Sequence, residues 1–202
     1  YGFHPELPPS ALRAGADAVV QSAHKTLHAL TMGAWLHVQG DRIDQRRLRE
    51  ALSTVQSSSP SFPIMASLDI SRAILEEKGE ALFEQSIRSS RHFASALVEQ
   101  CKWLRPSTRD VRGGRAYTDP LRVTITDKSG TMSGYRLQQE LEPRGCWPEM
   151  ADSRHVLLLF GINTCSGDVK RLLKACREID AVIDADRHAE SKEKQSSPAN
   201  AF

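Results

Sequence analysis

The sequence lacks the features that mark a membrane or secreted protein. None of its apolar runs approaches the ~20 residues that a bilayer crossing needs, and the opening YGFHPELPPS has no basic or apolar region of a signal peptide. The four cysteines show no CxxC spacing, which favours free thiols in a reducing compartment. We therefore expect a cytoplasmic protein whose cysteines are buried as small hydrophobic residues.

An excess of charge of one sign is also missing. The chain has 27 Lys and Arg against 25 Asp and Glu, interspersed, for a net charge of +2. Such a surface has no field that would attract nucleic acid or an anionic membrane, and the arginines of GDRIDQRRLRE lie among acidic residues, as on a solvated helix face. With 202 residues, 40% of them hydrophobic, the composition is that of a soluble globular chain with a sizeable core.

Apolar periodicity and turn signals predict a first lobe that leads into a long helix. Short strands are expected at residues 17–22 and 33–39, the first of them buried, and Asp44 is expected to cap the helix that follows. One long helix is expected from residue 66 to about residue 100, with a kink at Gly79.

The order of apolar patterns in the second half of the chain predicts a compact α+β or α/β lobe. Its expected order is strand 120–126, helix 133–142, strand 155–162 and helix 168–184. In the last helix apolar residues recur at i, i+3, i+4 and i+7, so one face is apolar. The polar, glycine-containing residues 105–119 are the expected lobe boundary, and the tail from residue 186 is expected to be disordered or a linker.

The stretch Ser22-Ala23-His24-Lys25 places a lysine between the two strands of the first lobe. In apolar surroundings desolvation disfavours the charged form of an amine and leaves it nucleophilic, as a Schiff base with pyridoxal phosphate requires. Ser22 offers a hydroxyl to a phosphate oxygen, and His24 can donate to the phosphate or stack near the cofactor. In the alternative interpretation Lys25 reaches solvent, and Ser22 and His24 only cap the turn.

This lysine motif resembles that of fold-type I pyridoxal-phosphate enzymes, and its context narrows the family. Three separated blocks are similar, in order, to the prokaryotic ornithine/lysine/arginine decarboxylase family: GFHPELPPSALRAGADAVVQSAHKTLHALTMGAWLHV, SSSPSFPIMASLDISR and SGYRLQQELEPRGCWPEMAD. The resemblance covers about residues 1–185.

The resemblance implies a function and a set of site residues. Lys25 matches the lysine that carries pyridoxal phosphate, and Ser22 and His24 match residues around the phosphate. The implied reaction is decarboxylation of lysine, arginine or ornithine to the corresponding amine, in a homo-oligomer. Ser58 matches a residue near the dimer interface whose hydroxyl reaches the phosphate of the other subunit. Ser57 and Ser59 are chemically as able, and serines before Pro60 can instead cap the following helix.

The resemblance also implies an α/β fold with defined parts. Residues 1–65 correspond to the C-terminal part of the cofactor-binding large domain, 66–105 to a connecting helix, 106–185 to a small α/β lobe and 186–202 to a tail or linker. The family's aspartate for the pyridinium nitrogen and its glycine-serine phosphate loop lie upstream of the segment that begins at Tyr1, and a C-terminal domain follows the matched part. We therefore expect the chain to correspond to the middle of a larger enzyme, and not to decarboxylate alone.

Two other functions remain open. Cysteine desulfurases and related aminotransferase-like proteins also use a Ser-x-His-Lys lysine, but they continue with a Gly-Pro turn where this chain has TLHALTMGAWL, and they need a nucleophilic cysteine, for which Cys146 and Cys165 are the candidates. A truncated paralogue could instead form a mixed dimer with a full-length decarboxylase. No metal site is expected, because the pair His24 and His28 lacks a third ligand. Trp147 is expected to pack within its loop.

Overall fold

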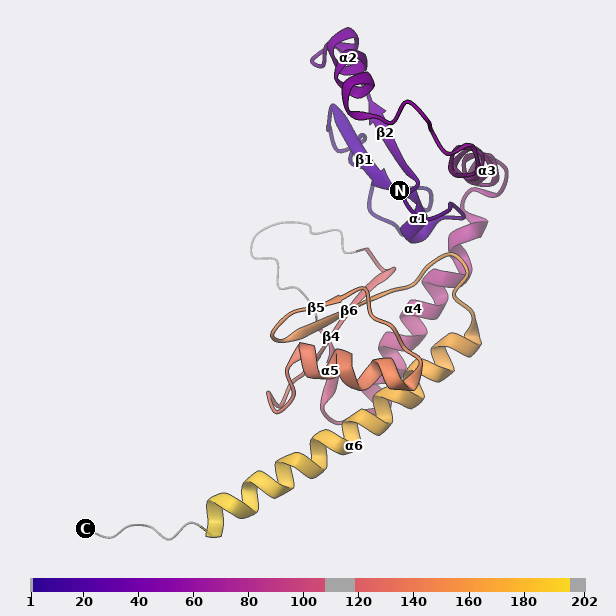
Figure 1. Ribbon diagram of the computed structural model, residues 1–202. Helices are drawn as coiled ribbons and strands as arrows, with labels where there is room; N and C mark the ends of the chain where they lie inside the picture. The colour runs from indigo at the N-terminus through magenta and orange to yellow at the C-terminus, as the bar shows by residue number, and fades with distance from the viewer. Residues whose placement is uncertain (1, 108–118, 197–202) are drawn as a thin grey trace, which may run out of the picture. The chain divides into compact units, whose positions relative to one another are not determined.

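The computed structural model describes residues 2–107 and 119–196, which belong to two units (Figure 1). Unit 1 comprises Tyr1–Glu84 with Tyr117–Asp119, and unit 2 comprises Gln85–Ala116 with Pro120–Phe202. Most of the polar connection that was expected at the lobe boundary, residues 108–118, lies outside the described residues. Within the described ranges none of the helices combines the length and the apolar composition that spanning a membrane requires.

Unit 1 begins with an antiparallel hairpin of two five-residue strands, β1 (Ala18–Ser22) and β2 (Ala34–Val38), joined through the short helix α1 (Ala23–Thr26). Both expected strands are confirmed, but the expected burial of the first is wrong. Val20, which is paired with Leu36, is 74% exposed. Successive side chains of a strand point to opposite faces, and the exposed residues of β1 alternate with half-buried ones, so one face of the hairpin is left open by the described residues.

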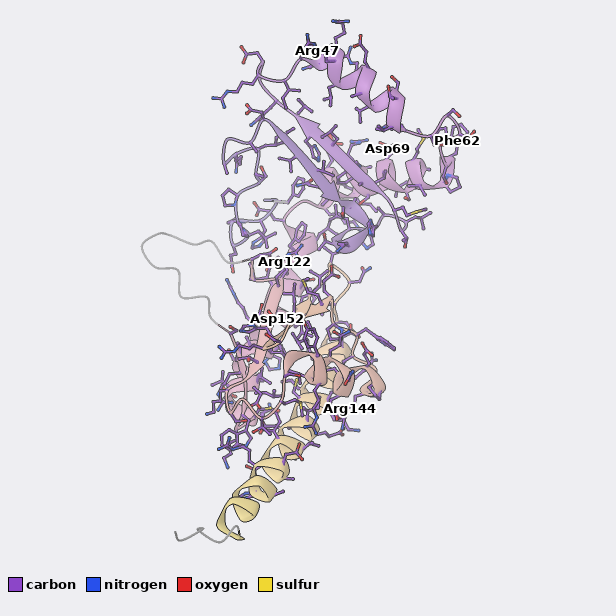
Figure 2. All side chains as sticks on the ribbon, turned by 60° about the vertical axis from the view of Figure 1, so that its left-hand side comes forward. Arg47, Phe62, Asp69, Arg122, Arg144 and Asp152 are labelled. Carbon is purple, nitrogen blue, oxygen red and sulfur yellow. The ribbon has the colours of Figure 1, made fainter. Side chains whose placement is uncertain are left out.

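Helix α2 (Gln45–Val55) begins as expected at Asp44. One oxygen of the Asp44 carboxylate accepts from the backbone N–H of Arg46 at 2.9 Å and of Arg47 at 3.1 Å, which satisfies donors that have no partner inside the helix. Arg46 also pairs with Glu50 one turn later. None of the residues of α2 is buried, so its arginines lie on a solvated helix (Arg47 is labelled in Figure 2).

The expected single helix from residue 66 to residue 100 is two helices, α3 (Phe62–Lys78) and α4 (Ala81–Gln100). Gly79 separates them with φ 45° and ψ −120°, a conformation that residues with a side chain rarely adopt. The Gly79 N–H still donates to the Leu75 carbonyl at 2.9 Å, which closes the last turn of α3. Glycine therefore ends the helix here, where the sequence indicated only a kink.

Helix α3 has an inner and an outer face. Ser71 and Leu75 are buried, whereas Phe62, Met65 and Ile70 are 75%, 50% and 57% exposed. Figure 2 shows Phe62 at the start of this helix. The described residues therefore leave large apolar side chains of α3 in contact with solvent.

The sheet of unit 2 has the strand order β3-β4-β6-β5, and all its neighbouring strands are antiparallel. The strands are β3 (Leu104–Pro106), β4 (Arg122–Asp127), β5 (Met150–Ala151) and β6 (His155–Leu159). Antiparallel pairing identifies this lobe as α+β, one of the two expected alternatives. Pro106, which has no N–H to donate, lies in an edge strand.

Helix α5 (Gly134–Leu141) runs into the 3-10 turn η1 (Glu142–Arg144), and its first residue lies against the β5–β6 turn. The Ser133 hydroxyl caps α5 by accepting from the Arg136 N–H at 3.2 Å. A Cβ at Gly134 would overlap the carbonyl oxygens of Asp152 and His155 and lie 2.7 Å from the His155 nitrogen. Only glycine therefore allows this approach of helix and turn, which Asp152 marks in Figure 2.

Helix α6 (Ser166–Ser196) is longer than the sequence indicated. The Asp168 carboxylate accepts from the Cys165 N–H at 3.0 Å, and this hydrogen bond lowers the pKa of Asp168. The helix continues through residues 186–196, for which disorder or a linker was expected, while residues 197–202 lie outside the described part. From Asp168 onward the helix contains no glycine or proline to end it, although its last turns have no apolar stripe.

One buried carboxylate connects α6 to the start of the sheet. Asp180 is 8% exposed and accepts three backbone hydrogen bonds, from Lys102 at 2.7 Å, Trp103 at 2.7 Å and Leu104 at 2.8 Å. One turn later Asp184 accepts from the Trp103 indole at 2.9 Å. The apolar stripe of α6 and the sheet supply buried side chains to a common core: Ile125, Val156, Leu158, Val169, Leu173, Cys176, Ile179 and Ile183.

Candidate functional site

The candidate site is the connection between the two strands of the unit 1 hairpin. Ser22 ends β1, and His24 and Lys25 lie in the single turn of α1. The chain then returns through residues 27–33 to β2 (Figure 1). The structure therefore brings Ser22, His24 and Lys25 together on one turn, as their spacing in the sequence requires.

His24 is held by the residue that precedes β2. The Gly33 carbonyl oxygen accepts from the backbone N–H of His24 at 3.2 Å and lies 3.0 Å from its ring nitrogen Nδ1. This oxygen therefore contacts both the backbone and the ring of His24. The ring is half-buried, so its orientation is defined by the return of the chain as well as by α1.

Helix α3 supports the loop that carries the Gly33 carbonyl. The Leu30 N–H donates to the Ser67 hydroxyl of α3 at 3.0 Å, and a Cβ at Gly33 would lie 2.9 Å from the Leu30 oxygen and 3.1 Å from Cδ2 of Leu68. Met32 has a φ of 74°, a strained conformation for a residue with a side chain. Sequence reasoning missed Gly33 and Ser67. The only signal was the glycine itself, which after Thr31-Met32 indicates a tight turn.

Lys25 is exposed, and so is Ser22. The apolar surroundings that were expected to desolvate Lys25 are not supplied by the described residues, so that part of the reasoning is wrong for this chain. Exposure of Lys25 agrees with the alternative in which it reaches solvent. The capping part of that alternative is wrong for Ser22, which makes no side-chain capping bond, whereas the contact of the His24 ring with the Gly33 carbonyl agrees with a structural role in the turn.

Ser58 lies apart from this turn, in the exposed segment between α2 and α3. The Ser57 hydroxyl accepts from the Ser59 N–H at 3.1 Å, and Ser61, not Ser58, occupies the N-cap position of α3. The interpretation of Ser58 as a helix cap is therefore wrong. Its role toward a phosphate in another subunit stays a prediction.

Of the two candidate nucleophiles of a desulfurase, Cys146 is poorly placed for that chemistry. Cys146 is buried, and burial raises the pKa of its thiol, which disfavours the reactive thiolate. Cys165 is exposed, so the expectation that all four cysteines are buried is wrong for this one. Trp147 is 77% exposed, which overturns its expected packing within the loop.

The donors of the α1 turn suit an anionic aldehyde. Lys25 offers a primary amine for covalent attachment, and Ser22 and His24 offer a hydroxyl and a ring nitrogen within three residues of it. Pyridoxal phosphate combines an aldehyde with a phosphate, so these residues fit it by chemistry.

Comparison with known proteins decides the family. The family model described as "Orn/Lys/Arg decarboxylase, major domain" matches residues 1–168, most of the chain and all of the α1 turn. The chain belongs to the Orn/Lys/Arg decarboxylase family. The resemblance of the three sequence blocks is thereby confirmed.

Relatives within this decarboxylase family are similar along most of the chain. An uncharacterized protein of Bacillus subtilis, YaaO, is 42% identical over 88% of this chain and 36% of its own length. An arginine decarboxylase of Bacillus cereus is 29% identical over 90% of this chain and 40% of its own length. The chain thus spans between about a third and two fifths of the length of these relatives.

A solved structure supports the fold of this family member. The lysine decarboxylase of Francisella novicida aligns with a TM-score of 0.70 and 20% identity, over 82% of this chain and 28% of that one. This likeness confirms the expected fold class, a part of the α/β fold that this lysine decarboxylase has.

Proposed function

We propose that this chain is the lysine-bearing segment of a pyridoxal-phosphate-dependent decarboxylase of lysine, arginine or ornithine, a carbon–carbon lyase. The single observation that carries the proposal is the α1 turn, which holds Ser22, His24 and Lys25 together within a family match that covers it. When bound, pyridoxal phosphate supplies the electron sink that stabilises the carbanion left after carbon dioxide departs. The free cysteines agree with a reducing compartment such as the cytoplasm.

Each residue of the turn has one role in this proposal. Lys25 attaches the cofactor through its amine. Ser22 and His24 donate to the phosphate and so fix the position of the cofactor relative to that amine. Ser58 donates to the phosphate held by a second subunit.

Covalent labelling tests the proposal. The purified chain is incubated with pyridoxal phosphate, its visible absorbance is recorded, the adduct is reduced with borohydride, and the modified peptide is mapped. We expect a single label at Lys25 that Lys25→Ala removes, because the other residues of the turn hold the phosphate near this amine. Lys78→Ala, which replaces an exposed lysine of the same unit, is the matched control and should keep the label. Label spread over surface lysines, unchanged in Lys25→Ala, would contradict the proposal.

The proposed assembly is a dimer in which α3 contributes to the interface. The exposed Phe62, Met65 and Ile70 support this, because large apolar side chains that gather on one helix mark contact surfaces. Phe62→Ser is expected to weaken self-association at least about tenfold in sedimentation equilibrium, or about 1.4 kcal/mol.

Val98→Ser is the control for this dimer prediction. Val98 is 50% exposed on α4 within unit 2, so its loss should leave self-association unchanged. A monomer at all concentrations would count against the dimer. Equal effects of the two substitutions would instead count against α3 as its interface.

A further inference from the structure

The contact between His24 and Gly33 limits what the imidazole can do toward an anion. A carbonyl oxygen only accepts hydrogen bonds, so the ring nitrogen Nδ1, 3.0 Å from the Gly33 oxygen, must carry the proton. In the neutral ring the other nitrogen, Nε2, then has a lone pair and no proton. Neutral His24 can therefore present only an acceptor at Nε2.

A phosphate also presents only acceptors once both of its protons are lost. An Nε2 lone pair facing such an oxygen would repel it, whereas a protonated Nε2 would donate a charge-assisted hydrogen bond. Because Nδ1 is already engaged, protonation of Nε2 makes the ring an imidazolium. The same carbonyl that fixes the ring thus decides the charge that His24 needs for phosphate binding.

We propose that His24 binds the phosphate of pyridoxal phosphate as an imidazolium, with Nδ1 donating to the Gly33 carbonyl and Nε2 donating to the phosphate, so that binding takes up a proton. The inference rests on the proposed function. It assigns the charge state of the phosphate-binding group and makes phosphate affinity fall as pH rises.

The titratable side chains nearest to His24 in the chain are those of Lys25 and His28, which follow on the same segment. On α3, which supports the loop, Arg72 pairs with Asp69 and with Glu76.

The hairpin strands supply little further charge. On them His37 bonds Gln21 at 3.0 Å. Among the described residues the His24 ring bonds the Gly33 carbonyl and no carboxylate. The phosphate itself is therefore the anion that favours the imidazolium.

Nitrogen NMR of the full chain without cofactor tests the geometry by itself. In the neutral ring of His24 we expect the proton on Nδ1, with the Nε2 signal that of an unprotonated nitrogen. His28, which lies on the same segment, serves as the internal reference. A proton on Nε2 in neutral His24 would overturn the inference without involving any ligand.

Competition between two aldehydes tests the charge. The affinity of the chain is measured for pyridoxal phosphate and for pyridoxal, which lacks the phosphate, by absorbance and by reductive labelling of Lys25. Attachment to Lys25 is common to both ligands, so its own pH dependence cancels in the ratio of affinities. The ligand phosphate loses its last proton near pH ~6, so its charge is constant at higher pH, while histidine changes charge between about pH 5 and 8.

From about pH 7 to 8.5 the affinity ratio of the wild type is expected to fall about tenfold or more, as loss of one bound proton requires. His24→Gln, a neutral donor, should give a flat ratio, and His28→Gln should keep the fall. A flat ratio in the wild type with Lys25 labelled would overturn the charge assignment alone. Failure of both aldehydes to label Lys25 would instead overturn the proposed function, and the inference with it.

Discussion

Replacement of Asp180 by alanine is expected to lower the free energy of unfolding of unit 2 by about 3–5 kcal/mol. The carboxylate accepts the backbone N–H groups of Lys102, Trp103 and Leu104, and all of them lose their partner in the variant. Water can reach these groups only in part, because Asp180 is 8% exposed and the Leu104 side chain is fully buried. Urea denaturation followed by far-ultraviolet circular dichroism measures the loss.

Two further variants make this prediction specific. Asp180→Asn keeps one acceptor oxygen for Trp103 and Leu104 but turns an amide toward the Lys102 N–H, so an intermediate loss of about 2 kcal/mol is expected. Asp186→Asn, on the same helix, breaks the partly exposed ion pair with Arg136 and should cost under ~1 kcal/mol. Equal stability of the three variants would show that the buried carboxylate is not what holds these residues.

Gly134→Ala is expected to destabilise unit 2 by about 3 kcal/mol or more, a large effect for one added methyl group. The methyl group would overlap the carbonyl oxygens of Asp152 and His155, and these are backbone atoms that a side-chain rotation cannot move. Either α5 moves away from the β5–β6 turn or the turn opens. The same urea denaturation reports the loss.

Gly161→Ala is the matched control for Gly134→Ala. A Cβ at Gly161 has no neighbour within 4 Å among the described residues, so the same substitution should change stability by less than ~1 kcal/mol. If Gly134→Ala proved as stable as Gly161→Ala, the close approach of α5 to the turn would be disproved.

The elements that sequence reasoning found are those with a local signal. The apolar stripe of α6 and the cap Asp44 follow from spacing and from side-chain chemistry. The strands β3 and β5 were missed, because strands of three and two residues carry no period and exist through their pairing with distant partners. The end of α3 at Gly79 was seen only as a kink, since glycine alone does not distinguish the two outcomes.

The candidate site was predictable in its residue types and less so in its environment. The order Ser22, His24, Lys25 and the two flanking strands were readable from the sequence. The exposure of Lys25 was not, because burial depends on what packs around the turn and not on the residues of the turn. The Gly33 carbonyl was equally hidden, because a backbone acceptor has no signature in residue identity.

The hydrogen bonds of Asp180 also constrain the order in which unit 2 can be completed during synthesis. The partners of this carboxylate at the start of β3 leave the ribosome 76 to 78 residues before it does. Contacts between residues so far apart in the chain form late, because the loop between them must first be closed. The edge strand β3 can therefore form its hydrogen bonds with Asp180 only after α6 has been translated.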